Sequence, residues 1–158
     1  MLKTKIAVFV SGGGTNFEAL INAQENGKIP HGEIVLMVSS SKTAYALKRA
    51  ENHGIKSVVC SKKELGSQEK FEEEILKNLE ENDIQLIVLA GFMSILSKEF
   101  TKKYENRIIN IHPSLIPSFC GEGFYGLHVH EAALKKGVKV TGATVHIVNE
   151  IPDGGPII

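Results

Sequence analysis

Three polar side chains in the second half of the chain are of the types that acyl transfer uses. Asn110 and His112 lie two residues apart at the end of an apolar run, and Asp153 stands in the segment Ile-Pro-Asp-Gly-Gly-Pro. Residues two apart in a strand point to the same face. An amide N–H and an imidazolium stabilise an oxyanion, histidine moves protons at neutral pH, and a nearby carboxylate favours and orients the imidazolium. We therefore predict an acyl-transfer centre at Asn110, His112 and Asp153.

The spacing alone leaves other interpretations open. An Asp-Gly pair is also typical of a turn at a strand end, and His112 could be a histidine without chemistry. His128 and His130 form an H-x-H pair, but a metal site needs further ligands. Cys60 and Cys120 have no metal-ligand or disulfide-framework spacing. We expect no metal.

A glycine-rich turn follows the first apolar run, in the segment Ser11-Gly-Gly-Gly-Thr-Asn16. Glycines let the backbone approach an anion, and the start of a helix offers unbonded N–H groups. Phe17 stands where a dinucleotide fingerprint needs its third glycine, and the turn lacks the Gly-Lys-Ser/Thr of a P-loop. The pattern favours one small phosphate ester over a dinucleotide. A simple turn with a capping box from Thr15 to Glu18 is the other interpretation.

The elements that must position these residues alternate along the whole chain. We expect strands over 6–10, 34–38, 58–60, 84–89, 108–111 and 138–148, and helices over 15–27, 44–53, 68–82, 98–104 and 129–136. Apolar strands that alternate with amphipathic helices predict a doubly wound α/β fold, with a mostly parallel sheet and helices on both faces. Ligands of such sheets bind beyond the carboxyl ends of the strands, where the motifs above fall.

Composition limits the class of protein further. The chain has 158 residues, which suits one domain, and its 18 basic residues balance 18 acidic residues. A nucleic-acid partner is therefore not expected. There is no apolar span long enough to cross a membrane and no cleavable leader pattern. We expect a cytoplasmic protein with no membrane partner, and its oligomeric state does not follow from the sequence.

Five segments in order resemble the phosphoribosylglycinamide formyltransferases, folate-dependent enzymes of purine biosynthesis. They are Ser-Gly-Gly-Gly-Thr-Asn at 11–16, Leu-Ala-Gly-Phe-Met at 89–93, Asn-Ile-His-Pro-Ser-Leu-Ile-Pro at 110–117, Gly-Leu-His-Val-His at 126–130 and Asp-Gly-Gly-Pro at 153–156. The resemblance implies a formyltransferase, Rossmann-like fold. It also implies transfer of a formyl group from 10-formyltetrahydrofolate, as co-substrate, to the amine of glycinamide ribonucleotide.

The resemblance also implies roles for individual residues. Asn110 and protonated His112 would stabilise the tetrahedral oxyanion, and Asp153 would favour the charged imidazolium and help to move the proton. The phosphate would lie on Gly14, Thr15 and Asn16. The folate would contact Asn110 and the residues Gln68, Met93, Ser94, Ile95 and Leu96. Arginines often stand in relatives where this chain has Gln68 and Ser94.

Two related enzymes and one non-enzyme remain as alternatives. Methionyl-tRNA formyltransferase carries a second, basic domain, and formyltetrahydrofolate hydrolase carries an extra N-terminal domain. A nucleotide- or folate-binding module without turnover is the non-enzyme alternative. Members of the family continue beyond the Asp153 motif through another strand and helices, so we expect residues 1–158 to be one catalytic domain that is truncated at its C-terminus, with those elements missing.

Overall fold

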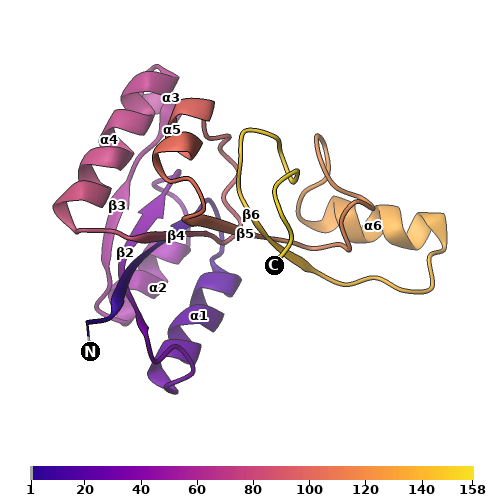
Figure 1. Ribbon diagram of the computed structural model, residues 1–158, viewed down its shortest axis with the longest axis horizontal. Coiled ribbons are helices and arrows are strands. Elements are labelled where there is room, and N and C mark those ends of the chain that lie inside the picture. Colours follow the sequence, from indigo (N-terminus) through magenta and orange to yellow (C-terminus); the bar gives the residue numbers. More distant parts are fainter. Residues whose placement is uncertain (1) are drawn as a thin grey trace. The chain divides into compact units, whose positions relative to one another are not determined.

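The computed structural model describes residues 2–158 (Figure 1), and these form two compact units, one that ends at Leu96 and one from Ser97 to Ile158. We refer to them as the first and the second unit. The glycine-rich turn and the residues 93–96 belong to the first unit, and Asn110, His112 and Asp153 belong to the second.

Four parallel strands form the sheet of the first unit. They are β1 (Thr4–Val10), β2 (Gly32–Ser39), β3 (Lys56–Val59) and β4 (Leu86–Leu89), in the spatial order β3-β2-β1-β4. The central strand β1 is buried on both faces, and its residues 6–10 are at most 6% exposed. Burial on both sides explains why residues 6–10 are all apolar rather than apolar at alternate positions.

Helices cover both faces of this sheet, as the strand-helix alternation predicts. The helices are α1 (Thr15–Glu25), α2 (Ala46–Asn52), α3 (Lys62–Leu65) and α4 (Gln68–Glu81). Val8 of β1 packs in one cluster with Phe17 of α1 and Ala50 of α2. The next residue, Phe9, points the other way and contacts Phe92, which stacks on Phe71 of α4. Figure 1 shows α1 and α2 on one side of these strands and α4 on the other.

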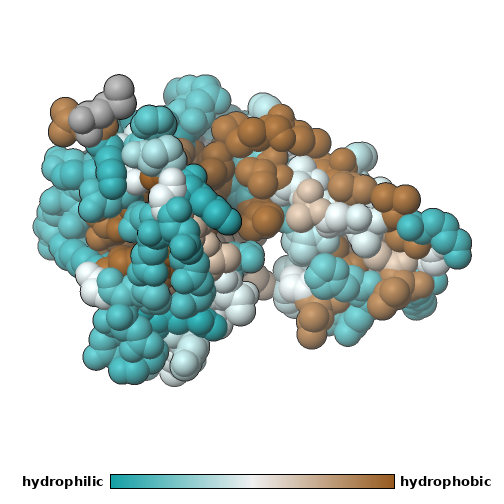
Figure 2. All heavy atoms as spheres, turned by 90° about the horizontal axis from the view of Figure 1, so that it is seen from below, coloured by the Kyte–Doolittle hydropathy of each residue, from teal (hydrophilic) through white to brown (hydrophobic). Residues whose placement is uncertain are grey.

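The second unit contains α5 (Lys98–Lys103), β5 (Ile108–His112), α6 (Leu127–Lys136) and β6 (Thr144–Ile147). Strands β5 and β6 are antiparallel. This unit leaves more apolar surface uncovered, as its brown areas in Figure 2 show. Leu127 and Leu134 on α6 are 74% and 81% exposed. Its polar cluster, described below, is nevertheless almost completely buried.

The predicted fold class is confirmed, while several element bounds and the alternative interpretation of the glycine-rich turn differ from the structure. The last strand was expected over 138–148, but only Thr144–Ile147 pairs with β5. The third strand begins at Lys56 and ends at Val59, before the expected end at Cys60. The capping box is absent, because Gly14 rather than Thr15 is the N-cap of α1 and no side chain caps it.

Within residues 2–158, no helix is both long enough and apolar enough to cross a membrane. The short helix α3 had no predicted counterpart. The expectation that residues 1–158 are a single catalytic domain stays a prediction.

Candidate functional site

The polar cluster of the second unit lies on paired residues of β5 and β6. Asn110 is directly opposite His146 in the antiparallel register, and His112 is opposite Thr144. Directly opposed residues of two antiparallel strands project from the same face. The pairing therefore gathers two histidines and one amide on one face, as the alternation of Asn110 and His112 along the strand predicts.

Asp153 lies between the two histidines. Its Oδ2 is 3.5 Å from Nδ1 of His112, and its Oδ1 is 3.6 Å from Nε2 of His146. The side chains of His112 and His146 are 5% and 2% exposed, and that of Asp153 is 15% exposed. A carboxylate this poorly solvated interacts with a neighbouring cation much more strongly than it would in water.

Hydrogen-bond acceptors face both ring nitrogens of His112. Its Nε2 lies 2.8 Å from the carbonyl oxygen of Phe119, which only accepts hydrogen bonds, so Nε2 carries a proton. Its Nδ1 faces the carboxylate of Asp153, another acceptor. Only an imidazolium presents a donor at both ring nitrogens. The surroundings of His112 therefore suit an imidazolium.

The two ring nitrogens of His146 have different hydrogen-bonding roles, one as a donor and one as an acceptor. Its Nδ1 lies 2.9 Å from the carbonyl oxygen of Ile147, so Nδ1 carries the proton. Its Nε2 lies 3.1 Å from the amide nitrogen Nδ2 of Asn110 and accepts a hydrogen bond from it. This hydrogen bond fixes the rotation of the Asn110 amide. The same amide group carries a second N–H, which could donate to a ligand.

Two loops bring Asp153 into the cluster. The backbone N–H of Gly121 donates to Oδ2 of Asp153 at 2.9 Å, and Asp153 itself has a positive φ of 54°. A Cβ on Gly155 would lie 1.8 Å from the carbonyl oxygen of Ile147, so only glycine fits there. The expectation that glycines beside the carboxylate let its loop approach another backbone closely is confirmed.

Buried hydroxyls hold the segment that follows His112. Thr144 Oγ1 donates to the carbonyl oxygen of Ser114 at 2.6 Å and accepts from the N–H of Ile116 at 3.0 Å. Ser114 Oγ donates to the carbonyl oxygen of Ser118. These bonds tie the loop to β6 and so help to place the Phe119 carbonyl against His112.

The glycine-rich turn of the first unit forms the start of α1. Gly14 has φ of 72°, in the left-handed region that glycine adopts at little cost. A Cβ on Gly14 would lie 2.8 Å from Cβ of Ala46, so the turn also packs closely against α2. Thr15 and Asn16 are exposed at the first helical positions, where backbone N–H groups have no partner within the helix. The turn can therefore receive an anion.

Of the residues that the resemblance assigns to folate, Asn110 belongs to the second unit, and the other five belong to the first. Gln68 Nε2 donates to the carbonyl oxygen of Ile95 at 3.1 Å and to Oε1 of Glu72 at 2.6 Å. Met93 and Ile95 are 54% and 73% exposed. Ser94 is half-buried and Leu96 is buried. Exposed apolar side chains on an ordered segment suit contact with a ligand, but these contacts stay a prediction.

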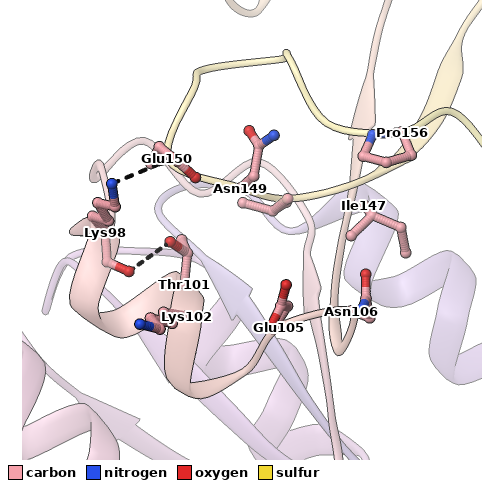
Figure 3. A pocket seen from close by; sticks show the side chains of 10 residues that line it. Lys98, Thr101, Lys102, Glu105, Asn106, Ile147, Asn149, Glu150 and Pro156 are labelled. Atoms are coloured by element: carbon pink, nitrogen blue, oxygen red, sulfur yellow. Dashed lines mark hydrogen bonds and ion pairs between the residues drawn. The ribbon is translucent and has the colours of Figure 1, made fainter.

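A cavity of about 430 Å³ opens in the second unit between α5 and the residues after β6 (Figure 3). Its wall includes Thr101, Asn106, Ile147 and Asn149. Lys98 and Glu150 face each other at its rim, with Nζ and Oε1 3.8 Å apart. Its volume falls within the usual range for small-molecule sites.

The sequence interpretation missed His146 as a member of the cluster. Only its register opposite Asn110 reveals it, and register depends on long-range pairing. His128 is exposed and faces Glu131 at 3.5 Å. Within residues 2–158 no group of three His, Cys, Asp or Glu side chains is arranged to bind a metal, and the expectation of no metal stays a prediction.

Comparison with known proteins gives consistent matches. Residues 4–158 match the family model described as formyl transferase. The trifunctional purine biosynthetic protein adenosine-3 of Gallus gallus is 47% identical over 99% of this chain and 15% of its own length. The phosphoribosylglycinamide formyltransferase of Haemophilus influenzae is 39% identical over 98% of this chain and 70% of its own length.

Solved structures agree in fold. Glycinamide ribonucleotide transformylase 1 from Geobacillus kaustophilus superposes with a TM-score of 0.90, at 38% identity, over 99% of this chain and 80% of that chain. The present chain thus spans part of its relatives, from 11% to 15% of the trifunctional proteins to 70% of the Haemophilus protein.

Proposed function

The chain belongs to the formyl transferase family, and we propose that it transfers the formyl group of 10-formyltetrahydrofolate to the amine of glycinamide ribonucleotide, a step of de novo purine biosynthesis. The single observation that carries the proposal is the placement of Asp153 between His112 and His146, with Asn110 bonded to His146. This arrangement offers a buried imidazolium and an oriented amide, both of which are donors to an oxyanion.

The proposed reaction begins when the amine attacks the formyl carbon and forms a carbon–nitrogen bond. The formyl oxygen then carries the negative charge of a tetrahedral intermediate, and the Asn110 amide and the His112 imidazolium donate hydrogen bonds to it. The bond from carbon to N10 of the folate breaks, the former amine loses a proton, and N10 gains one. The products are the formylated nucleotide and tetrahydrofolate.

The hydrogen bond from His112 Nε2 to Phe119 identifies a step that substrate binding must include. The oxyanion can accept a hydrogen bond from Nε2 of His112 only if it replaces the Phe119 carbonyl oxygen as the acceptor. A charged oxyanion is the stronger acceptor of the two. Asp153 stabilises the imidazolium throughout, from the side of Nδ1.

We assign the phosphate of the nucleotide to the backbone of Gly14, Thr15 and Asn16, supported by the positive φ of Gly14 and the exposed helix start. We assign part of the folate to the segment 93–96, supported by the exposed apolar side chains of Met93 and Ile95. An Ile95→Asp change, at a side chain that is 73% exposed, should raise KM for the folate and leave KM for the nucleotide within about twofold. Equal effects on both would contradict the assignment.

Steady-state kinetics with both substrates tests the proposed activity. His112→Ala should lower kcat by about 10² or more, with a modest change in KM, because the interaction strengthens only as charge develops. His128→Ala is the matched control, since this histidine is exposed and faces Glu131 on its own helix. Folate deformylation without the nucleotide would instead indicate a hydrolase. Binding with no turnover would indicate a ligand-binding module. The cytoplasmic location also stays a proposal.

A further inference from the structure

Arg49 on α2 lies at the centre of a charged network beside the glycine-rich turn, outside the groups used above. Its Nε donates to the carbonyl oxygen of Gly13 at 2.8 Å, and its NH1 lies 3.1 Å from Oε2 of Glu18. Its guanidinium also lies over the ring of Tyr45, 5.1 Å from the ring centroid. These three contacts fix the position of a side chain that is only 24% exposed.

The two glycines that precede Gly14 are not held in place by close packing. A Cβ added to Gly12 or to Gly13 would meet no atom within 4 Å. Polar bonds to α2 hold their carbonyl groups instead, since the N–H of Ala46 donates to the oxygen of Gly12 at 3.2 Å and Arg49 donates to that of Gly13. Glycine on both sides makes a peptide group easy to reorient. The orientation of the Gly13–Gly14 peptide therefore depends on one side chain.

The direction of that carbonyl decides where the next N–H points. In a trans peptide the C=O and the following N–H point in opposite directions. With the Gly12 and Gly13 oxygens held toward α2, the N–H groups of Gly13 and Gly14 point away from it. Successive N–H groups that face one side form a cradle for an anion, whereas a flipped peptide would place a carbonyl oxygen there and repel a phosphate.

We propose that Arg49 is a positioning residue for phosphate binding: its bond to the Gly13 carbonyl presents the N–H of Gly14 to the phosphate of the substrate. The inference rests on the proposed assignment of the phosphate to Gly14, Thr15 and Asn16. Glu18 supports the same peptide orientation indirectly, because its carboxylate holds the Arg49 guanidinium through NH1.

The network continues from Glu18 to the end of α2. His53 Nε2 lies 3.0 Å from Oε1 of Glu18, and its Nδ1 lies 2.9 Å from Oε1 of Glu25. Each carboxylate oxygen of Glu18 thus faces a different side chain, either Arg49 on α2 or His53 directly after it. This double attachment limits the movement of Glu18 and therefore of the guanidinium that it holds.

Calorimetric titration with two ligands tests this inference, namely glycinamide ribonucleotide and the corresponding riboside without phosphate. Arg49→Met should weaken nucleotide binding by about tenfold, the usual effect of losing a hydrogen bond from a charged donor, and leave riboside binding unchanged. The KM for the nucleotide should rise similarly, with kcat at saturation unchanged. Lys48→Met is the matched control, because it removes the same charge from the same helix, and Lys48 is bonded only to Glu51.

Arg49→Lys separates charge from geometry and keeps the test decisive if the methionine variant does not fold. Lysine keeps the charge but lacks the planar fork that reaches two acceptors at once. The nucleotide affinity of Arg49→Lys should therefore lie between those of wild type and Arg49→Met. If only the lysine variant folds, its nucleotide affinity should lie below that of wild type. The inference about Arg49 would be overturned if Lys48→Met and Arg49→Met weakened nucleotide binding equally, or if folded Arg49 variants bound the nucleotide as wild type does. Neither result would affect the proposed phosphate assignment. If the wild type binds nucleotide and riboside equally, the phosphate assignment fails as well.

Discussion

Replacing Asp153 with asparagine isolates the charge that faces His112. Asparagine has the same shape and tolerates the positive φ of 54° at this position. Its side-chain oxygen can still accept the N–H of Gly121, so the loop should keep its place. The change therefore removes a charge from the cluster without removing the atoms that fill it.

The distance between the two groups sets the expected size of the effect. Unit charges 3.5 Å apart interact by about 5 kcal/mol at an effective dielectric constant of about 20. The asparagine oxygen retains part of this attraction as a neutral acceptor. We expect a net loss of about 3 kcal/mol of transition-state stabilisation, which lowers kcat by about 10².

The assay is the steady-state rate at saturating nucleotide and folate, with the melting temperature measured in parallel. Glu131→Gln is the matched control, because it removes the same charge from the same unit and its side chain is 71% exposed. A folded Asp153→Asn protein with kcat within about threefold of wild type would refute the argument that this carboxylate supports a charged His112.

Three further predictions concern other parts of the molecule. Gly14→Val should lower the free energy of unfolding by at least about 1–2 kcal/mol and weaken nucleotide binding, because of its φ of 72° and the 2.8 Å approach to Ala46; unchanged affinity by calorimetry would reject the phosphate assignment. Burial raises the pKa of the Cys60 thiol to about 11, so a thiol reagent at neutral pH should label only Cys120 until the protein is unfolded, and rapid labelling of both would contradict this. Hydrogen bonds to two glutamates of α1 raise the pKa of His53 above 6.5. Its contribution to stability should therefore be complete below pH 6.5 and decline as the pH rises through the higher folded-state value, and a pH-independent difference in denaturation midpoint between wild type and His53→Gln would argue against it.

Local patterns were sufficient for the parts of the fold that bury apolar residues continuously. The run from Ile6 to Val10 predicts a strand covered on both faces, and it lies at the centre of the first unit. The spacing of Phe71, Ile75 and Leu79 predicts a surface helix, and all three side chains are buried in α4.

The predictions that differ from the structure concern segments whose conformation depends on contacts with residues distant in the sequence rather than on local residue propensity. Val138 and Val140 are β-branched and predict a strand, but they are 41% and 75% exposed and have no strand beside them. Pairing with β5 begins only at Thr144. At the start of α1, the packing of Gly14 against Ala46 places the N-cap one residue earlier than the capping-box pattern predicts.

The candidate site also combines residues that a local pattern predicts with residues that only long-range contacts bring in. Asn110 and His112 can be recognised from the alternation of a single strand. His146 joins them only through the register of β5 with β6, and Phe119 only through the path of a loop. Both contacts join residues that no local pattern connects.

The fate of the formyl carbon tests the central claim most directly. The protein would be incubated with glycinamide ribonucleotide and 10-formyltetrahydrofolate labelled with ¹³C in the formyl group, and the carbon would be followed by NMR. The account predicts that the label appears as a formamide on the nucleotide, at a rate that His112→Ala lowers by about 10². Label released as free formate at the same rate with or without the nucleotide would contradict it.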